Sequence, residues 1–214
     1  MASTPDPVIV AILAKAPVPG LAKTRLVPRL GAAGAADLQA RLIVRTVETA
    51  IRAAVGPVCL WCAPDAEHLV FVDLAARHGI ALRAQVEGDL GQRMHAVVAA
   101  ETMRAPVLLV GVDCPPLTAE HLRVCAAALR SHDAVLVPAE DGGYVLVGLR
   151  GPDARVFEDI AWGGPDVMAD TRRRLTERRL SWCEPFVLWD LDRPEDLDRD
   201  PTLVGGRRDT TRDG

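Results

Sequence analysis

The stretch Val8-Ile-Val-Ala-Ile-Leu13 runs almost directly into Lys15-Ala-Pro-Val-Pro-Gly20-Leu-Ala-Lys23-Thr24-Arg25. The apolar run predicts a buried β-strand, and the prolines and glycine after it predict a loop. No Asp or Glu occurs from Pro7 to Ala36, whereas Lys15, Lys23, Arg25 and Arg29 all fall in that range. Because cations and free backbone N–H groups attract anions, a strand that ends in such a loop is suited to binding a polyphosphate.

The loop is not a Walker A motif, because Ala22 stands where that motif requires a glycine before the lysine. We expect Lys23 to lie in a solvent-facing turn, where its charge would balance phosphate charge. The alternative is that these lysines and arginines are ordinary solvated cations beside a turn.

Apolar runs alternate with helical patterns along the chain, which predicts parallel strands joined by crossover helices. Several strands are unbroken runs of Val and Leu, as expected for a sheet that is covered on both faces. The sequence therefore predicts a three-layer α/β/α fold with a mostly parallel, mixed sheet. The expected strands are Val8–Leu13, Val58–Cys62, Ile80–Val86, Val107–Val112, Ala134–Val137 and Tyr144–Leu149, and the expected helices are Ala35–Ala54, Asp65–His78, Leu90–Met103 and Thr118–Arg130.

After Arg150 the pattern is looser. It predicts a loop or short helix at Asp153–Trp162, a helix at Pro165–Arg179 and a final strand at Phe186–Trp189. We expect residues 1–204 to form a single domain. The polar, glycine-bearing residues 205–214 are expected to be a disordered tail.

The composition excludes several classes of function. The chain has 214 residues and a net charge of −4 with only 4% aromatic residues, so it lacks the basic surface of a nucleic-acid-binding protein. The run Val8–Ala14 is too short to span a membrane, and the first seven residues do not resemble a signal peptide, so we expect a cytoplasmic protein. Five cysteines argue against a disulfide framework. Cys59 and Cys62 should point to opposite faces of one strand.

A second polar cluster follows the apolar run at Val107–Val112, where Asp113 precedes a cysteine and two prolines. Ligands bind such sheets at the carboxyl ends of the strands, so Asp113 should face the cationic loop. A carboxylate there could hold Mg²⁺ or Mn²⁺ together with substrate phosphates, or it could simply cap the following helix. Asp190 or Asp192 could supply the second carboxylate, since strand alternation would point both the same way, unless they belong to a solvated acidic face.

Two glycine-bearing joints complete the candidate site. Gln85 is followed by Gly88-Asp-Leu-Gly91-Gln-Arg93, where the backbone could closely approach a base or ribose. The segment Glu140-Asp-Gly-Gly-Tyr144 predicts a hairpin turn and by itself indicates nothing more.

These motifs give the chain a specific resemblance to a known family. It resembles the uncharacterised glycosyltransferase-like proteins associated with radical-SAM and selenium-domain gene sets, in the nucleotide-diphospho-sugar transferase (GT-A-like, Rossmann-like) superfamily. It is also similar to 2-phospho-lactate guanylyltransferase and molybdenum-cofactor guanylyltransferase. The matching segments are Ala14–Leu26, Gly88–Met94, Gly111–Leu117, Pro138–Leu149 and Asp190–Leu197.

The resemblance implies a site for each substrate. Lys23, Asp113 and Asp192 would be catalytic, with Asp113 and Asp192 holding the metal. The acceptor would contact Asp141, Gly142, Gly143, Tyr144 and Trp162. The nucleotide would contact Ala14, Lys15, Gly20, Lys23, Thr24, Arg25, Gln85, Gly88, Gly91 and Arg93.

Three functions are compatible with this pattern. The first is nucleotidyl transfer from a nucleoside triphosphate to a small phosphorylated acceptor, which the cationic loop and the lone Asp113 favour. The second is transfer of a sugar from a nucleotide sugar to a small acceptor, which the usual label of the family favours. The third is a nucleotide-binding module without catalytic activity. None of them requires nucleic acid or a membrane span.

Overall fold

The computed structural model describes residues 6–203, and these form a seven-stranded sheet in the order β3-β2-β1-β4-β6-β5-β7. The strands are β1 (Ile9–Lys15), β2 (Val58–Ala63), β3 (Ala81–Ala84), β4 (Val107–Val110), β5 (Ala134–Pro138), β6 (Tyr144–Leu149) and β7 (Trp182–Cys183). The α-helices are α1 (Val27–Ala53), α2 (Leu69–His78), α3 (Leu90–Glu101), α4 (Ala119–Ala128) and α5 (Val167–Glu177), and four short 3₁₀ helices lie at Thr24–Leu26, Ala154–Phe157, Pro194–Asp198 and Pro201–Leu203.

Strand direction determines which loops meet. β1 pairs in parallel with β2 and β4, β2 pairs in parallel with β3, and β5 pairs in parallel with β7, whereas β6 is antiparallel to both β4 and β5. The carboxyl ends of the parallel strands therefore share one edge of the sheet with the beginning of β6. The loops after β1 and β4 and the 139–143 turn meet at that edge.

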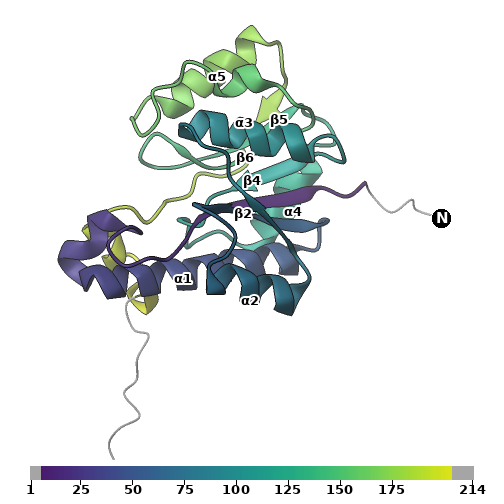
Figure 1. The fold of residues 1–214 in the computed structure, drawn as a ribbon. Coiled ribbons are helices and arrows are strands. Elements are labelled where there is room, and N and C mark those ends of the chain that lie inside the picture. The colour runs from purple at the N-terminus through teal and green to yellow at the C-terminus, as the bar shows by residue number, and fades with distance from the viewer. Residues whose placement is uncertain (1–5, 204–214) are drawn as a thin grey trace, which may run out of the picture.

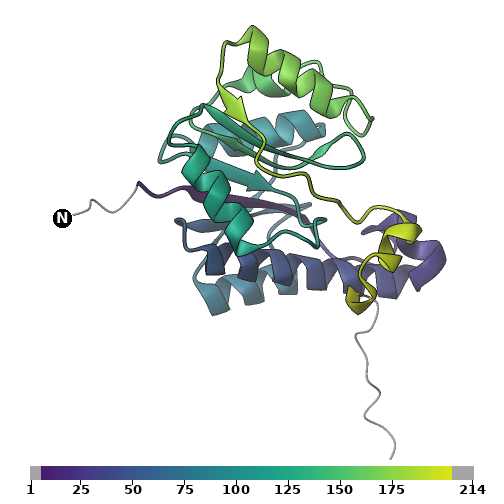
Figure 2. The same ribbon diagram turned by 180° about the vertical axis from the view of Figure 1, so that it is seen from behind.

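Helices cover both faces of the sheet, as the unbroken apolar strands predict. Helices α1, α2 and α4 pack on one face, and α3 and α5 pack on the other (Figures 1 and 2). Strand residues alternate between the two layers: Val10 and Ile12 belong to the first core, and Ile9 and Ala11 to the second. The three-layer, mostly parallel fold predicted from the sequence is confirmed.

Two predicted elements differ most from the structure, while others, such as the helix predicted at Asp65–His78 and observed at Leu69–His78, differ only in their ends. The first helix begins at Val27 rather than near Ala35, with a break at Gly31, whose φ of 70° is left-handed. The predicted strand at Phe186–Trp189 is wrong, because only Leu188 makes an isolated bridge there, to Ala139. The last strand is instead the two-residue β7, which pairs with β5. Two residues are too few to give a strand pattern in a sequence.

The chain after β7 forms a long connection, which we call the C-terminal strap (residues 184–203). It leaves β7 and passes the edge of the sheet at which the parallel strands end, and it then reaches the start of α1 (Figure 2). Three of its leucines are buried against leucines of the β1–α1 region. This small third core consists of Leu26, Leu38, Leu42, Leu191, Leu197 and Leu203. The predicted tail at 205–214 lies outside the described residues.

The two cysteines of β2 are placed as the strand pattern predicts. Cys59 belongs to the core beneath α3, and Cys62 belongs to the core on the opposite face. Both thiols are buried and free. Among residues 6–203, no helix is long and apolar enough to cross a membrane.

Candidate functional site

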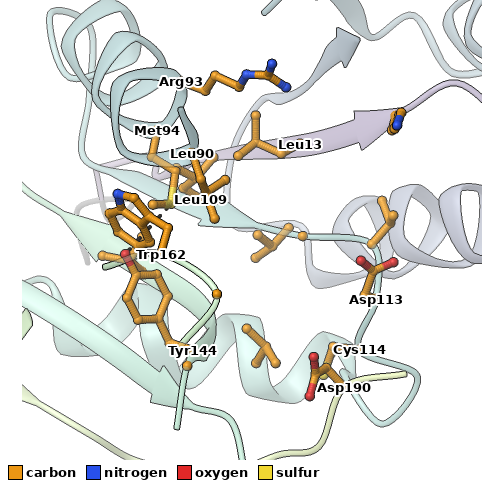
Figure 3. A pocket seen from close by; sticks show the side chains of 18 of the residues that line it. Leu13, Leu90, Arg93, Met94, Leu109, Asp113, Cys114, Tyr144, Trp162 and Asp190 are labelled. Carbon is orange, nitrogen blue, oxygen red and sulfur yellow. Dashed lines mark hydrogen bonds between the residues drawn. The ribbon is translucent and has the colours of Figure 1, made fainter. Parts of the chain in front are cut away.

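A pocket of about 590 Å³ lies at the carboxyl edge of the sheet. Its walls come from the ends of β1, β2 and β4, the start of β6, helix α3 and the segment before α5. Figure 3 shows that its ends differ: Asp113 and Asp190 lie at one end, and Leu90, Met94, Tyr144 and Trp162 lie at the other. Its position is the one expected for a ligand site in a sheet of this kind.

Polar groups line the wall near β1 to β3. The Nε2 atom of Gln85 donates hydrogen bonds to Trp61 O (2.8 Å) and Ala14 O (3.3 Å), which ties the ends of β1 and β2 together. The buried Gln39, which the sequence analysis did not identify, donates to Lys15 O (3.1 Å). Its position inside α1 gives no motif by which it could have been found.

Two cations of this wall are available for a ligand. Lys15 is exposed, and the Nε atom of Arg93 donates to Gly88 O at 3.0 Å. Neither side chain forms an ion pair with another residue in the described part of the chain. An anion in the pocket would therefore meet uncompensated positive charge on both.

The acidic end of the pocket consists of Asp113, Asp141 and Asp190. Burial raises the pKa of Asp190 to about 6, and the negative charges of Asp141, Asp192 and Asp113 contribute to that rise. A cation bound beside Asp190 would favour its ionised form.

These carboxylates are a suitable, though incomplete, donor set for a hard cation. Across residues 6–203, no three His, Cys, Asp or Glu side chains converge to form a complete metal site. Mg²⁺ and Mn²⁺ are usually held by only one or two carboxylates, with substrate phosphates and water as the other ligands. Asp113 and Asp190 fit that role. Strand alternation predicts that Asp190 and Asp192 point the same way. In the structure, Asp190 lines the pocket and Asp192 does not.

The expectation that Lys23 faces solvent is wrong. Its side chain is only 7% exposed, and its Nζ atom lies 2.8 Å from Asp113 Oδ1 and donates to Leu191 O. Arg25 forms an ion pair with Asp192. Both partners lie far along the chain, so no local pattern could reveal that these two cations are already paired.

Further contacts fix the cationic loop to the C-terminal strap. Arg29 donates to Pro194 O at 2.7 Å and forms an ion pair with Asp198. The Leu191 N–H donates to Asp113 O at 2.7 Å, so the strap is bound to the loop after β4 as well. These contacts with the strap therefore hold the loop after β1 in place beside the pocket.

The apolar end of the pocket consists of Leu13, Leu90, Met94, Tyr144 and Trp162. Tyr144 and Trp162 meet edge to face, with ring centroids 6.3 Å apart and planes at 87°. Burial raises the pKa of the Tyr144 hydroxyl well above its ordinary value. The phenol is therefore neutral at physiological pH.

Two of the predicted site glycines have packing roles instead. A Cβ atom at Gly91 would lie 2.6 Å from Trp162 Nε1 and 2.8 Å from Phe157 O, so glycine lets Trp162 pack against α3. Gly142 has a left-handed φ of 96°, and a Cβ atom there would collide with the Pro165 carbonyl. Neither glycine lines the pocket.

The pocket brings together more than half of the residues named from the sequence. Those that line it are Ala14, Lys15, Gln85, Gly88, Arg93, Asp113, Asp141, Gly143, Tyr144 and Trp162. Those that do not are Gly20, Lys23, Thr24, Arg25, Gly91, Gly142 and Asp192. Leu90 and Met94, which lie in the segment Gly88–Met94 but were not predicted as site residues, also line the pocket. Their spacing of four residues places both on one face of α3.

Comparison with known proteins gives a family and a fold. Residues 46–164 match the family described as uncharacterised proteins conserved in bacteria (DUF2064). A structure from Desulfovibrio desulfuricans G20, provisionally named a nucleotide-diphospho-sugar transferase, is 26% identical, with a TM-score of 0.81 over 95% of this chain and 91% of that one. No curated protein matches the chain by sequence.

More distant structures share the fold. A nucleotidyl transferase from Methanothermobacter is 14% identical, with a TM-score of 0.60 over 92% of this chain and 98% of that one. The 4-diphosphocytidyl-2C-methyl-D-erythritol synthase of Anaerococcus prevotii is 12% identical, with a TM-score of 0.59 over the same shares. By their names, these neighbours are transferases or synthases of nucleotide chemistry.

Proposed function

The chain belongs to the DUF2064 family, and we propose that it is a metal-dependent transferase that moves the nucleotidyl group of a nucleoside triphosphate onto a small phosphorylated acceptor. One observation carries the proposal. The pocket holds two unpaired cations, Lys15 and Arg93, opposite the carboxylates of Asp113 and Asp190, at the sheet edge where such folds bind ligands.

Each part of the pocket then has a role in binding. Lys15 and Arg93 neutralise the negative charge of the substrate phosphates. Catalysis of phosphoryl transfer depends on this kind of charge stabilisation. Gln85 and Gly88, which line the pocket beside Lys15 and Arg93, would lie near the base and ribose. Asp113 and Asp190 would hold Mg²⁺ or Mn²⁺, which when bound neutralises phosphate charge.

The reaction is a displacement at phosphorus. An oxygen of the acceptor phosphate forms a bond to the α-phosphorus of the triphosphate. The bond between that phosphorus and the oxygen bridging to the β-phosphate breaks, and pyrophosphate leaves with its electrons. The pocket residues contribute positioning and charge stabilisation, which supply most of the catalysis in such reactions.

Sugar transfer from a nucleotide sugar is the second candidate. The observation in its favour is the 26% identity to a protein provisionally named a nucleotide-diphospho-sugar transferase. The gene-set-associated glycosyltransferase-like proteins that the motifs resemble also support it. The guanylyltransferases that the motifs resemble support the first candidate and make GTP the first triphosphate to test.

The two reactions release different products, so one experiment separates them. Thermal unfolding is measured with each of the four common triphosphates and with a set of nucleotide sugars, with and without Mg²⁺ or Mn²⁺. We expect stabilisation by a triphosphate only when the metal is present, and pyrophosphate release when acceptor phosphates are added. Release of a nucleoside diphosphate from a nucleotide sugar would favour the second candidate. Tight, metal-independent binding without turnover would indicate an inactive module.

A further inference from the structure

The apolar end of the pocket has walls of one chemical kind. Leu90 is the first residue of α3, 46% exposed, and Met94 follows one turn later on the same helix face. Tyr144 and Trp162 form the opposite wall, edge to face. Figure 3 shows the four side chains directed toward one another around this end of the pocket, with Leu109 beneath them.

These walls have few polar atoms, and the Tyr144 hydroxyl is already used by the protein. The Tyr144 hydroxyl interacts with Thr171 and lies 3.8 Å from Met94 Sδ. The indole N–H of Trp162 lies against the backbone of α3 at Gly91. A polyhydroxylated sugar placed here would lose more bound water than the single indole N–H of Trp162 could replace, which is unfavourable.

The charged side chains that line the pocket lie outside its apolar end. Asp113, Asp141 and Asp190 form the acidic end, which the metal and the triphosphate would occupy under the proposed function, so the apolar end is left for the acceptor. Arg93 directly precedes Met94 and places a positive charge at the border of the apolar end. The geometry therefore suits a molecule with one anionic group and one apolar group.

From this division of the pocket we infer that the acceptor is a phosphate ester of a small apolar alcohol, with an aromatic ring or branched alkyl group that fills the apolar end. The inference rests on the proposed function, since it names the acceptor of that same site. It excludes sugar phosphates and other polyhydroxylated phosphates as preferred acceptors.

Binding is tested with phenyl phosphate as the probe and with glucose 1-phosphate and inorganic phosphate for comparison. The full chain is labelled with ¹³C in its methionine methyl groups, and the Met94 signal is identified from the variant Met94→Leu. We expect phenyl phosphate to shift the Met94 signal and to bind about tenfold more tightly than glucose 1-phosphate, because burial of the ring adds binding free energy.

A matched pair of variants locates the binding. Leu90→Ser should weaken phenyl phosphate binding severalfold and leave inorganic phosphate binding unchanged. Leu69→Ser is the control, because Leu69 is likewise the first residue of a helix and 80% exposed, but lies on α2, outside the pocket. Equal or tighter binding of glucose 1-phosphate, no detectable binding of phenyl phosphate, or an unchanged affinity in Leu90→Ser would overturn the inference.

Pyrophosphate release is measured separately, with triphosphate, metal and each phosphate ester. Selective phenyl phosphate binding without pyrophosphate release from any triphosphate would retain the apolar site and reject nucleotidyl transfer. Pyrophosphate release with glucose 1-phosphate as the better acceptor would retain nucleotidyl transfer and reject the apolar acceptor.

Discussion

Lys15 and Lys23 are two lysines of one loop with different surroundings. Lys15 is exposed and faces the pocket, whereas Lys23 is buried between Asp113 and the Leu191 carbonyl. A lysine that joins two other segments contributes to stability as well as to local charge. Their substitutions should therefore have different effects.

Lys23→Ala is expected to destabilise the fold by about 1–3 kcal/mol, because it removes a charged hydrogen bond and leaves the Leu191 carbonyl without its partner. In a chain of this size, each kcal/mol lowers the melting temperature by about 2–4 °C. Lys15→Ala should leave the melting temperature nearly unchanged but weaken nucleotide binding. Calorimetry and thermal unfolding of both variants test this, and equal melting temperatures would contradict the buried role of Lys23.

Asp190 and Asp192 differ in a similar way. Asp190→Asn keeps the shape of the side chain and removes its charge from the pocket, so metal-dependent triphosphate binding should weaken at least tenfold if Asp190 helps to hold the cation. Asp192→Asn is the matched control two residues away, whose carboxylate pairs with Arg25 outside the pocket. Titration with Mn²⁺ and triphosphate would count against Asp190 if only the Asp192 variant lost binding.

At these residues the sequence predicts the charge of the loop but not the partners of its cations. The loop after β1 could be recognised as cationic because its charges are local. The partners of Lys23 and Arg25 lie 90 to 168 positions away, and no periodicity encodes which of several carboxylates a cation will meet. Asp190 and Asp192 could not be distinguished either, because the segment that carries them is not a continuous strand and alternation does not apply to it.

In strand β2, the sequence pattern correctly predicts which face of the sheet each side chain occupies. Cys59 and Cys62 lie on opposite faces of this strand, and burial raises the pKa of each thiol to about 12. Both should therefore remain protonated and unreactive at pH 8. Titration with a thiol reagent in denaturant, before and after mild oxidation of the folded protein, should show no loss of these two thiols, and formation of a Cys59–Cys62 disulfide would contradict the strand assignment.

The short strand β7 depends on contacts outside its two paired residues. Asp133 Oδ2, just before β5, accepts hydrogen bonds from the Ser181 N–H (2.9 Å) and hydroxyl (2.7 Å), just before β7. These bonds hold the pKa of Asp133 below its ordinary value. A lowered pKa in the folded state means that ionised Asp133 adds stability above the unfolded-state pKa, and that this contribution is lost as pH falls through the folded-state pKa.

Asp133→Asn should therefore be less stable than the wild type near pH 7, by at most about 1 kcal/mol because the carboxylate is close to solvent. The difference should shrink as the pH falls below about 4, where the carboxyl group of the unfolded chain becomes protonated, and should vanish below the lower pKa of the folded state. Urea unfolding at several pH values measures it. A difference that stays constant down to pH 2.5 would show that the charge of Asp133 is not the cause.

Most elements were predictable from the sequence, and the predicted strand at Phe186–Trp189 shows why one was not. Apolar runs of four or more residues, such as Val107–Val110 and Tyr144–Leu149, could be identified as strands because burial on both faces requires them. At Phe186–Trp189 the same apolar signal has another origin. There Phe186 and Leu188 pack against the core from an irregular segment, and burial alone does not require a strand.

At the scale of the whole molecule, the small leucine core joins the beginning of α1 to the C-terminal strap. Leu197→Ala should destabilise the protein by about 2–4 kcal/mol, because it leaves a cavity among buried leucines. Limited proteolysis should then cut the strap before the sheet. Val187→Ala is the control, since Val187 lies in the same strap and is 64% exposed. Equal protease resistance of the two variants would show that the leucine core does not hold the strap.

The overall architecture could be predicted because it depends on averages over many residues, whereas the path of the strap could not. Alternating strands and helices determine a layered sheet through connection rules that hold across proteins. The strap has no such periodicity. Its course depends on a few leucines and on ion pairs such as Arg29–Asp198, whose pairing exists only in the folded chain.

The strap also determines when the pocket becomes complete during synthesis. Lys15, Arg93 and Asp113 are translated well before Asp190, and proteins tend to fold from the amino terminus as they emerge from the ribosome. A nascent chain that ends before the strap has the strands of the sheet but lacks Asp190 and the Leu191 carbonyl that Lys23 contacts. Under the proposed function, nucleotide binding would therefore require the strap, and an incomplete translation product would not withhold nucleotide from finished molecules.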